Sequence, residues 1–312
     1  MSAPTRRPRR TSPGRLLARR LAEHGTLVVA HRGTAVGSIA ENTRAAALAA
    51  LASGADVVEI DVATSADGEF FAFHDGAERR LLGIDENLTR LAARQIDALR
   101  YVHVDRPGRP ARVERLLDLL AALRPAALGV SEESAPLVNV DRSWNTWSTL
   151  LPALDGLDMA EQLLLKSPAA LAEPLDVLRR HGTAYPYLPI CTSVEQVREV
   201  VEDPDLEVVG VELLADGVDH PLADPGLISE LHARGLCVMV NAEVLTAGAP
   251  LFAGHDDEAA LRDGPEAGWG PLFDLGVDLV QTDWPWLLHA YRGTRSGLAA
   301  AGASVVDQEV RP

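Results

Sequence analysis

Short apolar runs recur along this chain and alternate with segments of helical or polar character. The runs cover residues 27–31, 56–62, 137–140, 161–165, 184–190, 207–214, 236–240 and 277–281. Apolar runs of this length, separated by helical segments, predict βα units and a parallel sheet. Because eight such units are what a closed barrel requires, we expect one α/β domain, a single (β/α)8 TIM barrel.

The first part of the chain carries the clearest local signals. Asn42-Thr43 precedes a run rich in Ala and Leu, which predicts a capped helix between the first two strands. Asp67-Gly68 is typical of a hairpin turn, so residues 69–74 are expected to return antiparallel, as a β-hairpin insertion after strand 2. Helical spacing follows at 91–99 and 113–123.

The second predicted strand carries two carboxylates among apolar residues. Strand alternation places Glu59 and Asp61 on one face, while the opposite face is wholly apolar. A solvated edge strand is the alternative, but charges in a buried strand are rarely left unpaired. His31 ends the first strand, and the hairpin brings His74 back toward the carboxylates. These residue types can hold a divalent cation and move protons beside it.

Six motifs follow one another between residues 27 and 75: His31-Arg32-Gly33, Glu41-Asn42-Thr43, Gly54-Ala55-Asp56, Glu59-Ile60-Asp61-Val62, Asp67-Gly68 and His74-Asp75. In this order and at these intervals they resemble the glycerophosphodiester phosphodiesterase family, phospholipase-C-like phosphodiesterases on a TIM barrel. Each motif alone is weak, but six in register are specific. The resemblance continues more thinly to Gln281-Thr282-Asp283 and implies hydrolysis of a glycerophosphodiester to glycerol 3-phosphate and an alcohol.

A metal site and an acid/base pair follow from these residues. Glu59 and Asp61 are predicted metal ligands, and Asp141 matches the acidic position that the family uses as its third ligand. Oxygen ligands without a thiolate favour one divalent cation, Mg²⁺, Ca²⁺ or Mn²⁺. His31 and His74 are the predicted general acid and base, in an order that the sequence leaves open.

Two basic residues are candidates for binding the phosphate. Arg32 is predicted to brace a phosphate oxygen; pairing with Glu41 or Glu59 is the alternative. Where the family usually has a lysine, two residues after its third acidic ligand, this chain has Ser143. Lys166, at the end of the next strand, is the candidate replacement, although such a lysine can also extend into solvent.

Other polar residues at strand ends are candidates for substrate contacts. Glu212 is expected to pair with a base or a substrate hydroxyl, or alternatively to form a salt bridge in the barrel rim, and Asn241 ends the seventh strand. Trp144 or Trp147 would wall an alcohol pocket, with a place in the core as the alternative. The glycine-rich residues 242–270 predict a long loop between strands 7 and 8, in which His255-Asp256-Asp257 is expected to be solvated.

Composition limits the choice of partner and location. The net charge of −16 argues against nucleic acid as a partner. The family resemblance implies a small-molecule phosphodiester as the partner instead. No apolar run approaches about 18 residues, which argues against stable membrane insertion, and a cytoplasmic location is the default. We expect a basic, disordered arm over 1–20, the barrel domain over 21–292 and a flexible tail over 293–312. The sequence does not indicate an oligomeric state.

Three classes of function fit these residues. A metal-dependent phosphodiesterase is favoured. A cyclising lyase or a sugar-phosphate synthase on the same barrel is the second possibility, and its product would differ in phosphorus NMR. A non-catalytic binder is the third. It is suggested by Ser143, where the family usually has a lysine, and by the lack of a tryptophan near strand seven, where the family often has one. The complete set of two histidines and three carboxylates argues against a binder.

Overall fold

The fold is known from a computed structural model that describes residues 14–105, 107–245 and 248–295. Its central strands are β1 (Leu27–Ala30), β2 (Val57–Thr64), β7 (Leu137–Asp141), β8 (Leu163–Leu165), β9 (Ile190–Cys191), β10 (Gly210–Leu213), β11 (Cys237–Asn241) and β12 (Leu279–Thr282). They pair in parallel in this order, and β12 pairs with β1, so the sheet curls round on itself. Between β8 and β9 the pairing consists of isolated bridges. Each of the eight apolar runs therefore overlaps the strand predicted from it, although β9 overlaps its run only at Ile190.

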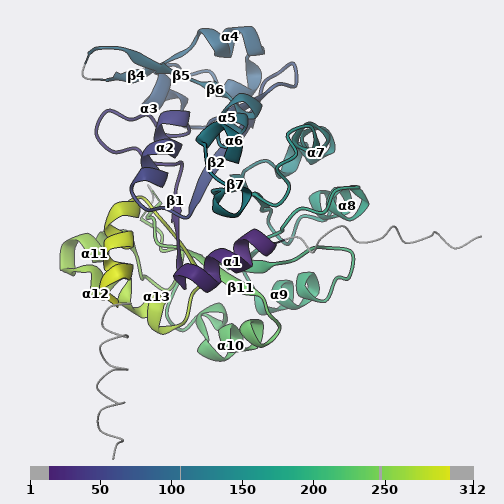
Figure 1. Ribbon diagram of the computed structural model, residues 1–312, viewed down its shortest axis with the longest axis vertical. Helices are drawn as coiled ribbons and strands as arrows, with labels where there is room; N and C mark the ends of the chain where they lie inside the picture. Colours follow the sequence, from purple (N-terminus) through teal and green to yellow (C-terminus); the bar gives the residue numbers. More distant parts are fainter. Residues whose placement is uncertain (1–13, 106, 246–247, 296–312) are drawn as a thin grey trace, which may run out of the picture.

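Helices surround the curled sheet (Figure 1). They are α2 (Arg44–Ala52), α5 (Leu116–Ala122), α6 (Pro125–Leu128), α7 (Trp147–Asp155), α8 (Ala172–Arg180), α9 (Val194–Val201), α10 (Pro225–Ala233), α11 (Asp257–Asp263), α12 (Pro265–Gly268), α13 (Gly270–Asp274) and a helix over 285–295. Short 3-10 turns lie at η2 (Glu132–Ser134), η3 (Trp144–Thr146) and η4 (Pro221–Ala223). The Thr43 side chain caps α2 by accepting from the Ala46 N–H, as the sequence predicted. None of the described helices has the length and hydrophobicity to cross a bilayer.

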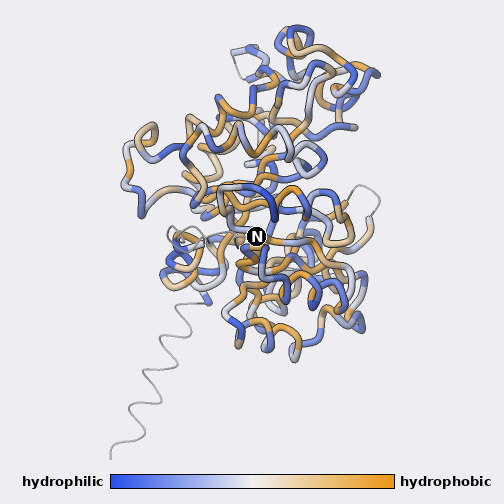
Figure 2. The backbone as a smooth tube through the Cα atoms, turned by 90° about the vertical axis from the view of Figure 1, so that its right-hand side faces the viewer, coloured by the Kyte–Doolittle hydropathy of each residue, from blue (hydrophilic) through white to orange (hydrophobic). Residues whose placement is uncertain are grey.

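Two apolar clusters lie on opposite faces of the strands. Leu27 and Val29 of β1 belong to the inner cluster, and Val28 between them belongs to the outer cluster, which packs against the helices. This is the period of two expected of a strand that is buried on both faces. In the side view of Figure 2, hydrophobic segments run through the body and hydrophilic segments lie mainly at its loops.

A helix closes the inner cluster at the amino ends of the strands. Helix α1 (Arg15–His24) places Leu16 and Leu17 against the apolar interior (Figure 1). The prediction of a disordered arm over 1–20 is therefore wrong for residues 15–20, because two adjacent leucines give this basic segment an apolar face to bury. Residues 1–13 lie outside the described part of the chain.

A lobe of strands and short helices follows β2 (Figures 1 and 2). Strand β3 (Phe70–Ala72) pairs antiparallel with β2 after the predicted turn. The lobe continues through α3 (Glu78–Leu82), η1 (Leu88–Arg90), α4 (Ala93–Ala98), β4 (Arg100–Val104), β5 (Pro110–Arg112) and β6 (Glu114–Arg115). The predicted helices over 91–99 and 113–123 are shortened to α4 and α5, and the β4–β5 pair was not predicted. These two strands are largely exposed, so they lack the alternation that marks a strand packed on a core.

The predicted long loop between strands 7 and 8 is wrong in its second half. Residues 257–268 form α11 and α12, because Asp256 caps α11 by accepting from the Ala259 N–H at 2.8 Å. The predicted tail is also shorter, because residues 293–295 belong to the helix over 285–295. The remainder of the tail, residues 296–312, lies outside the described residues.

Candidate active site

The inward positions of the strands change from apolar to polar toward their carboxyl ends. The polar and charged residues that follow the apolar layers are His31, Glu59, Asp61, Asn139, Asp141, Lys166, Glu212, Asn241 and Gln281. Most of them are buried, and Glu59, Asn139 and Lys166 are at most 1% exposed. Because burying so many polar groups is costly, they must satisfy one another or bind a ligand.

Three carboxylates form one compact group. Oxygen atoms of Glu59, Asp61 and Asp141 lie within 4.8 Å of one another, since the parallel register places Asp61 beside Asp141. Burial, and then the nearby Asp61 and Asp141, raise the pKa of Glu59 well above its usual value. Among the described residues no hydrogen-bond partner reaches Glu59 Oε1. An unpaired buried oxygen in an all-oxygen group of three acids fits a hard divalent cation.

The loop after β1 holds two of these carboxylates in place. The Arg32 backbone N–H donates to Glu59 Oε2 at 2.6 Å. Asn42 Nδ2 donates to Asp61 Oδ2 at 2.9 Å, and Asn42 Oδ1 accepts from the Asp61 backbone N–H at 3.0 Å. Gly33 lets the loop turn, because at its φ of 75° a Cβ atom would lie 2.8 Å from the Ala46 backbone. The positioning role of Asn42 was missed, although its motif was noted in the sequence.

Arg32 binds acids of the protein itself. Its Nη1 donates to Glu41 Oε1 at 2.8 Å, and its Nε lies 3.1 Å from Asp61 Oδ2. Arg80 shares Glu41 through two bonds of 2.9 Å. The alternative prediction, that Arg32 pairs with Glu41 or Glu59, therefore holds for Glu41. Glu59 is contacted only by the backbone N–H of Arg32. The guanidinium remains beside the carboxylate group, at its edge.

Lys166 is fully inside the site. Its Nζ lies 2.9 Å from Asp141 Oδ2 and 2.9 Å from Glu212 Oε2. Asn241 Nδ2 donates to Glu212 Oε1 at 2.8 Å, so Asp141, Lys166, Glu212 and Asn241 form one connected row of polar contacts. The alternative in which Lys166 extends into solvent is therefore wrong, and Glu212 forms the salt bridge expected as its alternative. Burial opposes ionisation of Asp141, but Lys166 outweighs it and lowers the pKa of that carboxyl.

Ser143 serves the packing of the strand end. Its hydroxyl donates to the Val140 carbonyl at 3.3 Å and accepts from Trp147 Nε1 at 2.9 Å. Trp147 is 1% exposed and belongs to the outer core, and Trp144 packs against the same core. The hypothesis of a pocket wall is therefore wrong for Trp147, which holds the alternative core position, whereas Trp144 is only partly buried.

His31 is paired with an acid at the end of β12. Its Nδ1 lies 2.8 Å from Asp283 Oδ1. Burial alone would lower the pKa of His31, but Glu243, Asp283 and Glu59 outweigh it and raise the pKa to about 10. Glu243 is itself buried, and this burial raises its pKa to about 7.

His74 lies at the end of the hairpin in a different environment. Its Nδ1 lies 2.8 Å from the Asp75 carbonyl oxygen, and because a carbonyl only accepts, Nδ1 carries the proton in the neutral ring. Burial lowers the pKa of His74, with Arg32 and Arg142 adding to the effect, while Asp61 opposes it. Arg142 Nη2 binds the Asp75 carboxylate at 2.8 Å, which anchors the hairpin end.

Asp257 organises the backbone behind His31. Its Oδ1 accepts from Trp269 Nε1 and from the Thr282 hydroxyl, and its Oδ2 accepts from the Asp283 backbone N–H, each at 2.8 Å. Asp257 is 2% exposed, so the expectation that this acid is solvated is wrong. Asp256 caps α11, and Asp257 is the first, buried residue of that helix. These roles were missed in the sequence because the segment was interpreted as a loop.

The sequence profile of the glycerophosphoryl diester phosphodiesterase family matches residues 31–284. The chain belongs to this family. It is an enzyme of the glycerophosphodiester phosphodiesterase type, and the family's reaction is phosphodiester hydrolysis. Comparison with curated proteins gave no match.

Solved structures of this kind share the fold. A putative glycerophosphodiester phosphodiesterase from Galdieria sulphuraria is 17% identical, with 86% of this chain and 98% of that chain covered and a TM-score of 0.63. One from Agrobacterium tumefaciens is 23% identical, with coverage of 85% and 99% and a TM-score of 0.54. A phosphodiesterase from Oleispira antarctica, in complex with the product sn-glycerol-3-phosphate, is 18% identical, with coverage of 83% and 94% and a TM-score of 0.59.

Proposed function

We propose that this phosphodiesterase is a metal-dependent (β/α)8-barrel enzyme that hydrolyses a glycerophosphodiester to glycerol 3-phosphate and an alcohol. The observation that carries the proposal is the buried group of Glu59, Asp61 and Asp141, with one oxygen left unpaired. The Oleispira antarctica structure, which holds sn-glycerol-3-phosphate, supports the choice of product.

The charge balance of the site supports a divalent ion held by the three carboxylates. Lys166 pairs with Asp141 and Glu212, and Arg32, which lies beside Asp61, is shared with Glu41, so these acids and Glu59 outnumber the cationic side chains that contact them. Mg²⁺, Ca²⁺ or Mn²⁺ would balance the remainder, and when bound such an ion stabilises the charge that spreads over the phosphate oxygens. Because the pKa of Glu59 is raised in the free site, binding would release any proton that it carries.

Unpaired polar atoms in the barrel interior support a hydroxyl-bearing substrate. In the described part of the chain, Asn241 Oδ1, Gln281 Oε1 and Glu243 Oε2 are buried without hydrogen-bond partners. These are acceptors at the carboxyl ends of β11 and β12, and a glycerol moiety offers the matching donors. We place Arg32 and Lys166 on the phosphate side. Glu212 holds Lys166 and is itself held by Asn241, and both Glu212 and Asn241 contact the substrate.

The hydrogen bonds of the two histidines suggest their roles. His74 keeps a proton on Nδ1 for the Asp75 carbonyl, which leaves Nε2 as an acceptor, and its lowered pKa favours the neutral ring. We therefore assign His74 as the general base that takes the proton of the attacking nucleophile. His31, with Asp283 behind it, favours the protonated ring and is assigned as the acid that protonates the leaving alkoxide.

The proposal is tested by the release of glycerol 3-phosphate from a panel of glycerophosphodiesters. The protein is treated with EDTA and then supplied with Mg²⁺, Ca²⁺ or Mn²⁺. We expect activity to disappear with EDTA and return with at least one metal, and phosphorus NMR to show a monoester. Activity that is unaffected by EDTA would contradict metal dependence, and a cyclic diester as the final product would point to a lyase.

A variant pair sharpens the test. Asp141→Asn removes one charge from the proposed ligands, and we expect metal binding in calorimetry to weaken at least tenfold. Asp118→Asn removes the same charge from an exposed position of α5 and serves as the matched control. An unchanged titration with Asp141→Asn would exclude this residue as a ligand.

A further inference from the structure

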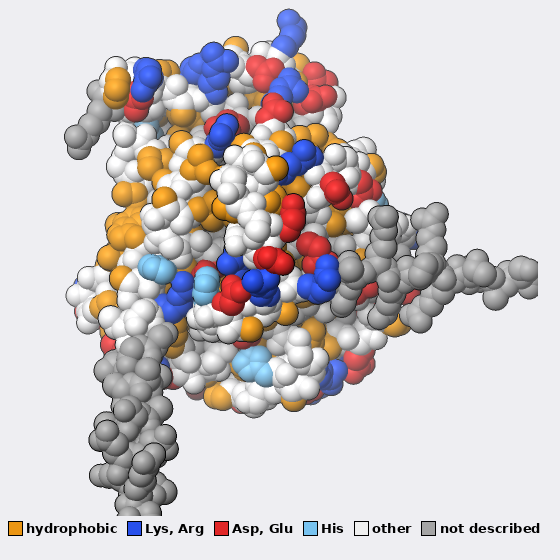
Figure 3. All heavy atoms as spheres, viewed as in Figure 1, with side chains coloured by type: hydrophobic (Ala, Val, Ile, Leu, Met, Phe, Trp, Pro, Cys, Tyr) orange, Lys and Arg blue, Asp and Glu red, His pale blue; other side chains and the backbone are white. Residues whose placement is uncertain are grey.

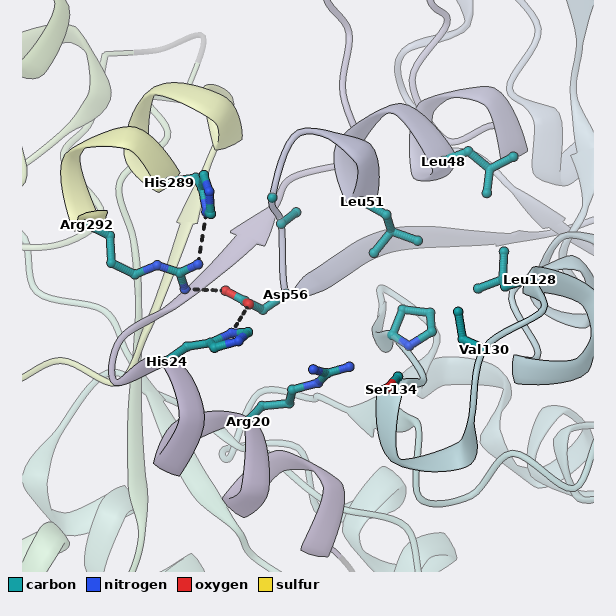
Figure 4. A pocket seen from close by; sticks show the side chains of 13 residues that line it. Arg20, His24, Leu48, Leu51, Asp56, Leu128, Val130, Ser134, His289 and Arg292 are labelled. Atoms are coloured by element: carbon teal, nitrogen blue, oxygen red, sulfur yellow. Dashed lines mark hydrogen bonds and ion pairs between the residues drawn. The ribbon is translucent and has the colours of Figure 1, made fainter. Parts of the chain in front are cut away.

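A pocket lies beside the amino ends of β1 and β2 (Figure 4), whereas the carboxylate group lies toward the carboxyl ends of the strands. Its volume is about 520 Å³, within the range of small-molecule sites. Helix α1, the turn from α2 to β2, residues 128–136 and the helix over 285–295 form its walls. Figure 3 shows basic, acidic and histidine side chains gathered on this face around α1, with hydrophobic side chains above them.

One side of this pocket is basic. Arg20, His24, His289 and Arg292 line it, and Asp56 is the one carboxylate among the described lining residues. Asp56 is already engaged, because it binds His24 Nδ1 and Arg292 Nη1 and also accepts from the Val28 N–H at 2.8 Å. Asp56 therefore supplies no counter-charge to Arg20, whose acidic contact is the partly exposed Glu23 at 3.5 Å.

Arg20 is the group that points to a ligand. Its Nη2 donates to the Ala135 carbonyl at 3.1 Å, and its Nη1 lies 3.5 Å from Glu23. The Nε atom is buried and, among the described residues, has no hydrogen-bond partner. The side chain is only 16% exposed, and Figure 4 shows it extending from α1 toward Ser134. A buried N–H of a cation without an acceptor is unfavourable, and an anion would supply the acceptor.

The opposite side of the pocket is apolar. Leu48 and Leu51 of α2 face Leu128 and Val130 across it (Figure 4). Val130 is 41% exposed, so this apolar surface is open to solvent. A ligand chain placed between these side chains would be favoured by the hydrophobic effect.

We propose that this pocket binds an amphiphilic anion, with a carboxylate or phosphate headgroup at Arg20 and an alkyl chain between the Leu48–Leu51 and Leu128–Val130 walls. A volume of about 520 Å³ corresponds to roughly 17 water-sized groups of about 30 Å³, which accommodates a chain of about ten carbons. The whole protein carries a net charge of −16, so anion binding at this face depends on the local basic side chains. The proposal is independent of the phosphodiesterase chemistry.

The experiment measures binding of decanoate and decyl phosphate to the full chain by calorimetry, with glycerol 3-phosphate present to occupy the phosphodiesterase site. Decyltrimethylammonium and inorganic phosphate test the headgroup charge and the chain separately. We expect both decyl anions to bind at micromolar concentrations, and the cation and inorganic phosphate to bind at least about tenfold more weakly. The ratio between the two anions distinguishes a carboxylate ligand from a phosphate ligand.

Two variants locate the binding. Arg20→Gln is expected to weaken both anions by about tenfold or more. Val130→Trp, which fills the apolar side from an exposed position, is expected to abolish binding. Arg19→Gln is the matched control, because Arg19 lies on the same helix and binds the same Glu23 but does not line the pocket.

Several outcomes would overturn the proposal. These are no binding of either decyl anion up to about 1 mM, equal binding of the decyl cation, or equal affinities in Arg20→Gln and Arg19→Gln. Phosphodiesterase activity and melting temperature of each variant verify that it is folded. If Arg20→Gln fails to fold, unchanged binding in folded Val130→Trp still contradicts the assignment.

Discussion

The two ends of the curled sheet bury opposite kinds of side chain. At the amino ends, Leu27, Val57 and Leu279 pack with Leu16 and Leu17 of α1, and none of them leaves a polar group to satisfy. At the carboxyl ends, the same strands bury acids, amides and a lysine, and several of their atoms lack hydrogen-bond partners within the described residues.

This difference indicates a division of labour along each strand. The apolar layer inside the amino ends gains free energy from burial and requires no ligand, in contrast to the separate pocket outside it that Arg20 lines. The polar end is costly in isolation, because acids close together raise each other's pKa, as at Glu59. Its cost is offset when a cation and a substrate occupy it. Stability should therefore depend mainly on the amino end and activity mainly on the carboxyl end.

The largest effect is expected from the two histidines. His31→Ala and His74→Ala should each lower kcat by about 10²- to 10⁴-fold, because each removes a proton-transfer group. The melting temperature should change little, because both rings lie at strand or hairpin ends. Steady-state kinetics and thermal melts measure the two effects. His232→Ala is the matched control, since His232 also binds an aspartate, Asp278 at 2.8 Å, but lies outside the site. A wild-type kcat in His31→Ala or His74→Ala would refute the proposed roles.

The apolar end is tested by Leu17→Ala. Leu17 is 2% exposed, and we expect its truncation to lower the free energy of unfolding by about 3 kcal/mol, through lost burial and the cavity left behind. The kcat of the folded fraction should be unchanged. Urea denaturation followed by circular dichroism measures the first quantity. Arg19→Ala, on the exposed side of α1, is the control. Loss of kcat without loss of stability would contradict the division between the two ends.

Asp257→Asn tests the support behind His31. Burial raises the pKa of Asp257 from 3.8 to about 6. Because the folded-state pKa lies above the unfolded value, the protonated carboxyl stabilises the fold at low pH, and this contribution is lost as the pH rises from about 4 to 6. A shift of this size corresponds to about 3 kcal/mol. The stability of the variant relative to wild type should therefore increase with pH across this window.

The same variant should also affect catalysis. The amide nitrogen of an asparagine cannot accept a hydrogen bond from the Asp283 N–H. Asp283, the partner of His31, should therefore shift, and kcat should fall about tenfold because a catalytic group is misplaced. Unfolding at several pH values and kinetics at one pH check both effects. Stability curves of variant and wild type that stay parallel between pH 4 and 7 would contradict the account of Asp257.

The smallest effect is expected at the cap of α2. Thr43→Ala removes the bond to the Ala46 N–H and should cost about 1 kcal/mol of stability. Because Thr43 directly follows Asn42, which holds Asp61, a small loss of kcat should accompany it. Thr43→Ser keeps the hydroxyl and should restore both quantities. A Thr43→Ser variant as unstable as Thr43→Ala would show that the methyl group, and not the cap, is responsible.

Local patterns were sufficient for the strands and for the polar face of β2. Glu59 and Asp61 lie on one face because side chains alternate along any strand, whatever surrounds it. Local patterns were insufficient for the β4–β5 pair and for α11, since exposed strands and short capped helices carry little periodic signal. The exposed-lysine alternative at Lys166 failed for a related reason: its two acids come from other strands, Asp141 from β7 and Glu212 from β10.

The sequence by itself determined the order of strands and helices, the family and the residue types at the strand ends, because these depend on local periodicity and on motifs within 49 residues. Only the tertiary structure decided which of these residues meet. The Asp257–Asp283–His31 row, the Lys166 pairs and the amphiphilic pocket each join segments far apart in sequence. Such contacts depend on how the sheet curls and on which acid lies nearest in space, and no local pattern encodes either.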